Sequence, residues 1–261
     1  MKYLFFLLTI LSCIPAQTQT PDEIAYKHQI SIGPGYNQGY LRDRNFSPLG
    51  YSEGGSLFGV RYAKQHQRSR FAINLAYSSG NIKTPVSPHF TTSYILGNLS
   101  IAYVREIPPF SNDKLRIYLG PQYSFYIYYL DWEDQDAFSF MATHSLDLAV
   151  QGRYQLNDLH RLAAQLSIPV VNLIVRPPYN GNDEELGRNN DEGNVFALIT
   201  NGSWGSWNKI FAYTLSLQYY YALTQRLDLL IGYENRYQRT EESFSYRHAH
   251  NQFTLGLTLT F

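Results

Sequence analysis

The chain has 261 residues, with 21 Lys and Arg balanced by 21 Asp and Glu, so its formal net charge is zero. This balance excludes a strongly basic nucleic-acid-binding protein. The unusual feature is an aromatic content of 16%, with 23 Tyr, in a chain whose mean hydropathy of −0.31 would otherwise indicate a soluble protein. A transmembrane β-barrel reconciles the two, because half of each strand faces a polar lumen and lowers the average hydropathy.

Residues 1–16 have the pattern of a secretory signal peptide: Lys2, then an apolar run over residues 4–11, then Ala16 before a polar stretch. The run is too short for a transmembrane helix, which needs about 20 apolar residues. We therefore expect a mature chain of residues 17–261. The alternative is lipidation at Cys13. Cleavage after Ala16 would remove the sole cysteine, leaving neither a disulfide framework nor a Cys metal site.

Segments of alternating apolar and polar residues follow one another along the mature chain, which is the period of strands with one apolar face. We expect strands at residues 27–36, 56–65, 70–78, 92–106, 114–130, 140–154, 161–175, 209–223, 227–237 and 252–261. In the seventh strand the phase slips near Val170, which predicts a β-bulge. The last strand alternates without interruption and ends on Phe261.

The connections alternate in length. Those at residues 66–69, 108–113, 157–160 and 224–226 are short, and those at 40–53, 80–89, 131–136, 176–208 and 241–251 are longer. Short periplasmic turns and long extracellular loops are typical of bacterial outer-membrane barrels. The sequence thus predicts an all-β, antiparallel, up-and-down transmembrane barrel of about ten strands, closed by its first and last strands, with both termini periplasmic.

Two alternatives remain for the fold. Eight or twelve strands are possible, since residues 194–200 could add a hairpin. A soluble lipocalin-type barrel would reverse the faces, and is disfavoured because charged residues would then coat the outside while the Tyr-rich set crowded the lumen.

The Ala16-Gln17 end of the signal, the GPGY sequence of residues 33–36, the Tyr-rich strands and the terminal Phe261 resemble the small outer-membrane β-barrel proteins of Bacteroidota-type bacteria. The resemblance implies that Phe261 is read by the barrel-assembly machinery. It is architectural and carries no catalytic residue across.

Seven charged residues are expected to face the lumen. They are Arg61, Arg116, Asp147, Arg153, Arg161, Asp228 and Glu234. Charges in a narrow lumen must be paired or hydrated. A salt-bridged plug is the favoured interpretation, because small barrels are filled by their side chains, and a selectivity ring in a pore is the alternative.

Histidines offer the main route to an enzyme. Barrel hydrolases that act on lipids use a His and a Ser two residues apart on one face, whereas His144 and Ser145 are adjacent and point to opposite faces. His248 and His250 do share a face near Glu241 and Glu242, which would suit acid–base chemistry at the rim, as in omptin-type proteases, or metal binding. Rim histidines are more often simply polar.

The loops supply candidate contacts with partners. Acidic residues cluster at Asp131, Glu133, Asp134 and Asp136 and again in residues 183–192, without the spacing of a calcium-binding loop. Trp204 and Trp207 lie in the longest connection. We expect no cofactor, no metal site and no catalytic residue. The expected function is that of a non-enzymatic barrel with a largely plugged lumen, contacting membrane lipid, lipopolysaccharide or a partner protein through its loops.

Overall fold

The computed structural model describes residues 27–45, 47–132, 137–176, 199–241 and 245–261. The predicted signal peptide, residues 1–16, lies outside this range. Among the described residues, no helix is both long and apolar enough to cross a bilayer.

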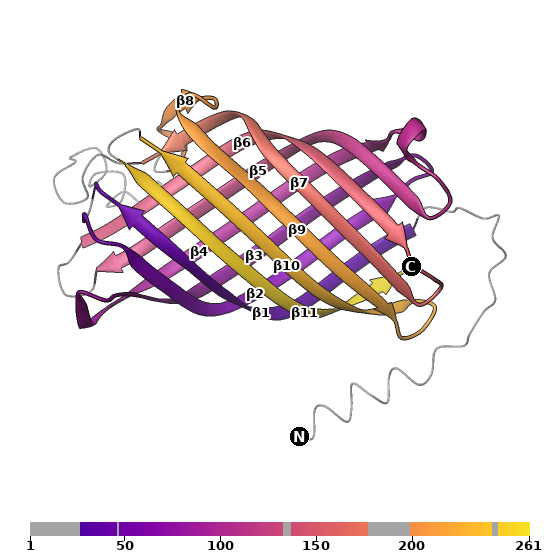
Figure 1. Cartoon of the computed structure of the whole chain (residues 1–261), viewed down its shortest axis with the longest axis horizontal. Helices are drawn as coiled ribbons and strands as arrows, with labels where there is room; N and C mark the ends of the chain where they lie inside the picture. Colours follow the sequence, from indigo (N-terminus) through magenta and orange to yellow (C-terminus); the bar gives the residue numbers. More distant parts are fainter. Residues whose placement is uncertain (1–26, 46, 133–136, 177–198, 242–244) are drawn as a thin grey trace, which may run out of the picture.

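The described chain is almost entirely β-structure (Figure 1). The strands are β1 (Lys27–Asp43), β2 (Tyr51–Gln65), β3 (Ser69–Thr84), β4 (Ser87–Glu106), β5 (Leu115–Trp132), β6 (Ala137–Gln155), β7 (His160–Val175), β8 (Ser203–Gly205), β9 (Ile210–Ala222), β10 (Leu227–Thr240) and β11 (Tyr246–Thr260). One 3-10 turn, η1 (Pro108–Phe110), joins β4 to β5.

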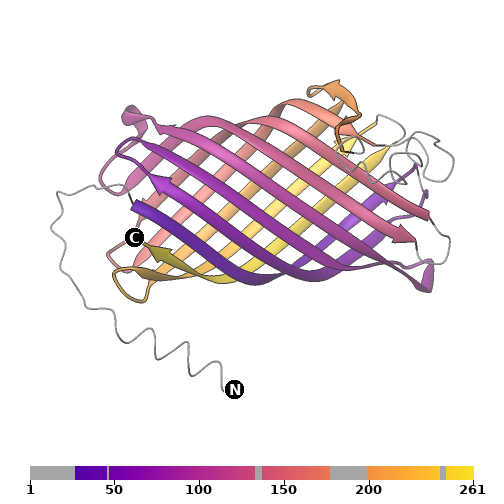
Figure 2. The ribbon, with the colours of Figure 1, turned by 180° about the vertical axis from the view of Figure 1, so that it is seen from behind.

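Ten of these strands form one closed antiparallel barrel, as predicted (Figures 1 and 2). Each of β1 to β7 pairs with the next, β7 pairs with β9, and β9 to β11 continue the ladder. The barrel closes where β1 pairs with β11 from Gln29↔Thr260 to Asp43↔Tyr246. The short β8 pairs only with the end of β7, so it adds no strand to the barrel wall.

The predicted phase slip near Val170 is confirmed. The β6–β7 register shifts between Leu146, which pairs with Val171, and Asp147, which pairs with Pro169. The extra residue lies between two parts of β7: the part up to Ser167 pairs with β9, and residues 172–174 pair with β8.

The two ends of the barrel differ. At the end that carries the start of β1 and the C-terminus, here called the terminal end, the β2–β3, β6–β7 and β9–β10 connections are short (Figure 1). The β4–β5 connection, which contains η1, also lies at this end. The opposite end, here called the loop end, carries the β1–β2, β3–β4, β5–β6 and β10–β11 connections and residues 176–202 between β7 and β8.

Three connections predicted at the loop end are wrong in extent. Residues 40–53, 80–89 and 241–251 contain the ends of β1, β2, β3, β4 or β11, and only Pro85 and Val86 separate β3 from β4. The outward residues there, such as Asn81 and Lys83, are exposed and polar. The strands therefore extend further toward the loop end than the alternating apolar residues from which they were predicted.

Large apolar side chains form a continuous exposed band around the outside of the barrel. Exposed members from nearly every strand are Ile30, Ile32, Phe58, Val60, Leu75, Ile101, Leu119, Leu146, Leu148, Val150, Leu162, Leu166, Leu217, Ile231, Leu255 and Leu259. The residues between them point inward and are mostly small or polar. An exterior of this kind suits hydrocarbon, and a closed sheet leaves no unpaired edge in it.

The seam between β1 and β11 depends on two glycines. A Cβ on Gly33 would lie 2.6 Å from the Cα of Gly256, and one on Gly256 would lie 3.1 Å from the Cα of Gly33. The backbones therefore approach more closely here than any side chain would allow. This explains the Gly-rich character of the first strand.

We expect Leu255→Arg to destabilise the barrel by about 2–4 kcal/mol in phospholipid vesicles, because Leu255 is exposed in the middle of the apolar band. Asn81→Arg, a control on the outer face near the loop end, should cost about 0–1 kcal/mol. Denaturant titration with tryptophan fluorescence measures both. Equal costs for the two variants would contradict the assignment of the band to lipid.

Candidate functional site: the interior of the barrel

The barrel interior has three layers between the loop end and the terminal end. We call them the plug layer, the polar cavity and the arginine layer. Because the side chains of strands alternate, each layer is built from every second residue of strands all around the barrel.

The plug layer fills the lumen toward the loop end with buried apolar and aromatic side chains. Its core consists of Leu41, Tyr51, Ile82, Tyr94, Leu96, Tyr126, Tyr128, Leu130, Met141, Ile174, Ile210, Ala212 and Tyr246. The rings of Tyr94 and Tyr128 stack with centroids 5.5 Å apart. Such packing excludes water from this part of the lumen.

The tyrosines thus have two locations, one on the outer face and one inside the barrel. Tyr36, Tyr77 and Tyr103 are exposed on the outer face, where a ring with a polar tip suits the lipid–water boundary. Seven others are buried and inward: Tyr51, Tyr94, Tyr118, Tyr126, Tyr128, Tyr220 and Tyr246. Crowding of the lumen by tyrosine, used as an argument against a soluble barrel, occurs in this barrel as well.

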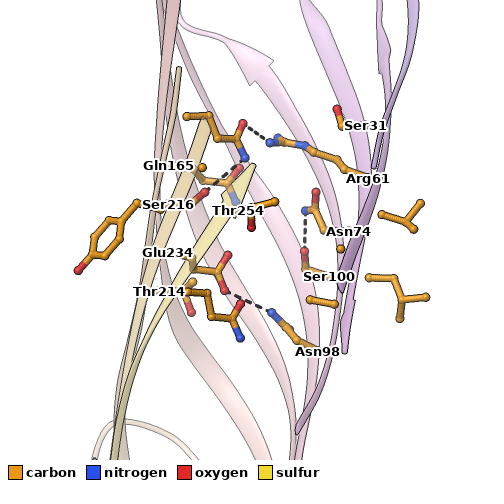
Figure 3. A pocket seen from close by; sticks show the side chains of 18 of the residues that line it. Ser31, Arg61, Asn74, Asn98, Ser100, Gln165, Thr214, Ser216, Glu234 and Thr254 are labelled. Atoms are coloured by element: carbon orange, nitrogen blue, oxygen red, sulfur yellow. Dashed lines mark hydrogen bonds between the residues drawn. The ribbon is translucent and has the colours of Figure 1, made fainter. Parts of the chain in front are cut away.

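The polar cavity lies beneath the plug layer and has a volume of about 130 Å³, enough for several water molecules. Its lining comes from strands on opposite sides of the barrel, including Arg61, Asn74, Asn98, Gln165, Ser216 and Glu234 (Figure 3). Asn74 donates a hydrogen bond to Ser100 at 2.8 Å, and Asn98 donates one to Glu234 at 3.4 Å. Arg61 donates to Gln218 across the lumen.

The arginine layer lies between the cavity and the terminal end. Arg70 is buried there, close enough to Arg61, Arg153 and Arg161 for their charges to interact. The guanidinium of Arg161 lies 4.4 Å from the ring centroid of Tyr220, in cation–π geometry. Packing several arginines together in a narrow lumen is electrostatically costly unless carboxylates, amides or water compensate.

Within the described chain, two of the seven predicted charges form an ion pair with each other. Arg161 and Asp228 pair at 2.8 Å. Arg153 instead donates to the amide oxygen of Gln65 at 2.9 Å, and Asp147 accepts from Ser124 at 2.6 Å.

Three more of the predicted charges are Arg61, Glu234 and Arg116. Arg61 and Glu234 bond to amides in the cavity, as above, and Arg116 lies on the inward side of β5, opposite Arg153 on β6. All seven face the lumen, and the contacts between them and neutral amides or hydroxyls outnumber their ion pairs. The interior is therefore a hydrogen-bonded network with a few charges in it.

Sequence reasoning missed several inward charged residues, among them Asp43, which pairs with the buried Arg176 near the loop end. Arg70 and Arg236 each lie an even number of residues from the other inward-facing residues of their strands, and this alternation could have revealed them. Glu53 was assigned to a loop, yet it is an inward, buried residue of β2. His248 and His250 were expected at the rim, and both are buried in the plug layer beside Glu53.

His144 and Ser145 face opposite sides, as their adjacency predicted. Ser145 is buried on the inward side. His144 lies on the outer side, with its Nδ1 2.8 Å from the Tyr123 hydroxyl and its Nε2 2.8 Å from the carbonyl oxygen of Ile199. They cannot act together on one substrate.

The loop candidates are partly described. Trp204 in β8 and Trp207 beyond it are 68% and 64% exposed, and the Trp207 indole donates to the carbonyl of Pro169. Asp131 lies near the end of β5, where its carbonyl accepts from Thr92. Glu133, Asp134 and Asp136 lie outside the described residues.

Phe261, proposed as an assembly signal, is exposed at the terminal end. Its backbone exchanges hydrogen bonds of 2.8 and 2.9 Å with His28, and the two rings stack at 5.6 Å. The last residue therefore continues the β1–β11 seam.

Comparison with known proteins identifies the fold. No protein-family model and no curated protein matches the sequence. Among solved structures, the outer membrane protease OmpT from Escherichia coli is similar, at 9% identity over 93% of this chain and 100% of that chain, with a TM-score of 0.54. The Neisserial surface protein A is also similar, at 13% identity over 90% of this chain and 97% of that chain, with a TM-score of 0.38. So is the attachment invasion locus protein Ail of Yersinia pestis, at 11% identity over 91% of this chain and 100% of that chain, with a TM-score of 0.36. The likeness to OmpT shows that the chain has the fold of an outer-membrane β-barrel, and nothing about its activity.

We expect Asp228→Asn to destabilise the protein by about 1–3 kcal/mol, because Arg161 would lose its charged partner in the arginine layer. Adding Arg161→Gln should recover part of that loss, which a double-mutant cycle in denaturant measures. The control Glu241→Gln breaks an exposed pair with Arg239 and should change stability by at most about 1 kcal/mol. Additive effects of Asp228→Asn and Arg161→Gln would contradict the coupling.

Proposed function

We propose that this protein is a non-enzymatic β-barrel of a bacterial outer membrane, of the Bacteroidota type, whose lumen is largely closed and which acts through its extracellular loops or as part of a membrane assembly. The observation that carries the proposal is the plug layer, in which thirteen apolar and aromatic side chains fill the lumen. A lumen packed in this way favours a role for the outer surfaces of the barrel.

The proposed orientation puts the terminal end in the periplasm and the loop end outside the cell. Its support is the difference between the short connections at one end and the longest connection, residues 176–202, at the other. In this orientation Phe261 is available to the barrel-assembly machinery, while Trp204 and Trp207 lie on the outside.

Burial of the histidines supports a non-enzymatic role. His248 and His250 are 2% and 1% exposed, beneath packed tyrosines, where a polypeptide or lipid substrate has no contact with them. The hydrolase alternative requires at least one of these imidazoles at a solvated surface.

The exposed tryptophans support a role for the loop end. Indole side chains are frequent at binding surfaces because they combine a large apolar area with a hydrogen-bond donor. Lipopolysaccharide, outer-membrane lipid and a partner protein are the proposed contacts.

We expect the refolded chain to give no steady conductance in a planar bilayer. Removing the stacked pair by Tyr94→Ala with Tyr128→Ala should open a leak that prefers anions, because the arginine layer lies on the path. Tyr77→Ala with Tyr103→Ala, which removes two exposed outward rings, is the matched control and should stay silent.

A narrow channel is the second candidate, favoured by the polar cavity of about 130 Å³ and the arginines below it. Steady, ion-selective steps from the unaltered protein would support this candidate and refute the closed lumen.

We also expect a photo-crosslinking amino acid at Trp204 to give a discrete adduct in intact cells, while the same amino acid at Lys83, exposed on the outer face of β3, gives none. Gel mobility with and without lipopolysaccharide-specific staining separates a lipid adduct from a protein adduct. Identical patterns at the two positions would argue against a contact specific to β8.

A further inference from the structure

Three potential metal ligands meet inside the plug layer. One ligand atom from each of Glu53, His248 and His250 can be chosen so that all lie within 4.8 Å of one another, and all three residues are buried. His248 and His250 project from the same face of β11, and Glu53 comes from β2, with β1 between these strands.

Gly39 in β1 makes this meeting possible. It is the cross-strand partner of both His250 and Glu53. A Cβ at this position would lie 2.5 Å from Oε1 of Glu53 and 2.9 Å from the Cβ of His250. The absent side chain leaves the space across which the carboxylate and the imidazoles approach.

Two of the three groups are held in place by further hydrogen bonds. The Nδ1 of His248 lies 2.6 Å from the Tyr126 hydroxyl, which leaves Nε2 directed at Oε2 of Glu53, 2.9 Å away. Tyr128 donates to the same Oε2 at 2.8 Å, and Asn37 donates to Oε1 at 3.1 Å. Metal-binding histidines and carboxylates are commonly oriented by outer partners of this kind.

His250 is the exception. It is 1% exposed, yet neither ring nitrogen has a hydrogen-bond partner in the described part of the chain. Its ring stacks on Tyr126 at 5.7 Å with an interplanar angle of 7°. A buried imidazole with two unsatisfied nitrogens costs free energy unless something binds it.

We propose that Glu53, His248 and His250 bind one divalent transition-metal ion of the zinc type. Two imidazole nitrogens and one carboxylate oxygen suit Zn²⁺ and its first-row neighbours, whereas Ca²⁺ and Mg²⁺ prefer all-oxygen sites. This inference goes beyond the proposed function and does not depend on it.

The geometry needs only small adjustments. Ligands about 2.0–2.2 Å from a tetrahedral Zn²⁺ lie roughly 3.3–3.5 Å apart. The His248–Glu53 distance of 2.9 Å therefore opens slightly as the ion replaces the shared proton, and His250 turns without breaking a hydrogen bond. Gln252 and Arg236 flank His250 and line the polar cavity, which supplies water for the fourth position.

Charges around the cluster act in opposite directions. The Arg236 side chain, opposite His250 on β10 and 4.1 Å from the Tyr126 ring centroid, disfavours a cation. The buried carboxylate of Glu53 favours one. Since the arginine layer below also repels cations and the plug layer blocks the other end, the ion is captured as β1 and β11 close the barrel.

The test is to refold the mature chain, residues 17–261, with Zn²⁺ present, remove loose metal with EDTA and measure zinc per folded barrel by mass spectrometry. Heat-modifiable migration on a gel confirms folding. We expect about one zinc per chain. Glu53→Gln and His250→Gln should each reduce retention by at least about tenfold, since loss of an outer partner alone costs about 10–100-fold. His28→Gln, a histidine at the terminal end, should retain the ion.

A second measurement needs no variant. Cu²⁺ refolded into the unaltered chain should give an electron paramagnetic resonance spectrum with coupling to two nitrogens. Folded barrels without retained zinc, zinc retention unchanged in Glu53→Gln and His250→Gln, or a Cu²⁺ spectrum without nitrogen coupling would each overturn the proposal.

Discussion

The structure depends on closure of the sheet through β1 and β11. A backbone in hydrocarbon must satisfy every N–H and C=O within the protein, so the strands of a membrane-spanning sheet cannot leave an edge. Here the requirement brings residues at the two ends of the chain together, from His28 against Phe261 to Asp43 against Tyr246. Closure after ten strands also fixes a narrow interior, and this forces the inward side chains into contact.

The polarity of the two faces changes along the barrel axis. In the lipid-facing band, apolar residues point outward and polar residues such as Asn74 and Gln122 point inward. Toward the loop end the inward residues become apolar, while outward residues such as Asn81 and Lys83 are polar. The part of the wall near the loop end is thus built like a water-soluble barrel, whose interior is packed by the hydrophobic effect. The interior near the terminal end is instead organised by hydrogen bonds.

Much of the fold could be predicted from the sequence because the lipid imposes a strict period on the outward residues. The alternation of residues 252–261 fixed one face of β11, and the slip at Val170 revealed the bulge in β7. The alternation of apolar residues is lost at strand ends that lie beyond the lipid. In residues 51–55, for example, the outward-facing residues are Ser52 and Gly54, which are not apolar. Glu53 was therefore taken for a loop residue.

The interior was less predictable for a different reason. The alternation of side chains along a strand shows that a residue points inward, but it does not show which residue it contacts on the other side of the lumen. Glu53 and His248 are 195 positions apart, and only the register of two β1 pairings brings them together. Likewise, Arg161 and Asp228 were both expected in the lumen, while the amide partners of Arg61 and Arg153 were not.

Gly39 illustrates how a position without a side chain can determine the chemistry of its neighbours. In an antiparallel ladder the cross-strand neighbours of one residue lie on the same face, so Glu53 and His250 flank Gly39 on its two sides. A larger residue would push the Glu53 carboxylate and the His250 ring apart. The seam that closes the barrel is therefore also the place where Glu53, His248 and His250 meet, so the formation of this cluster depends on the closure of the sheet.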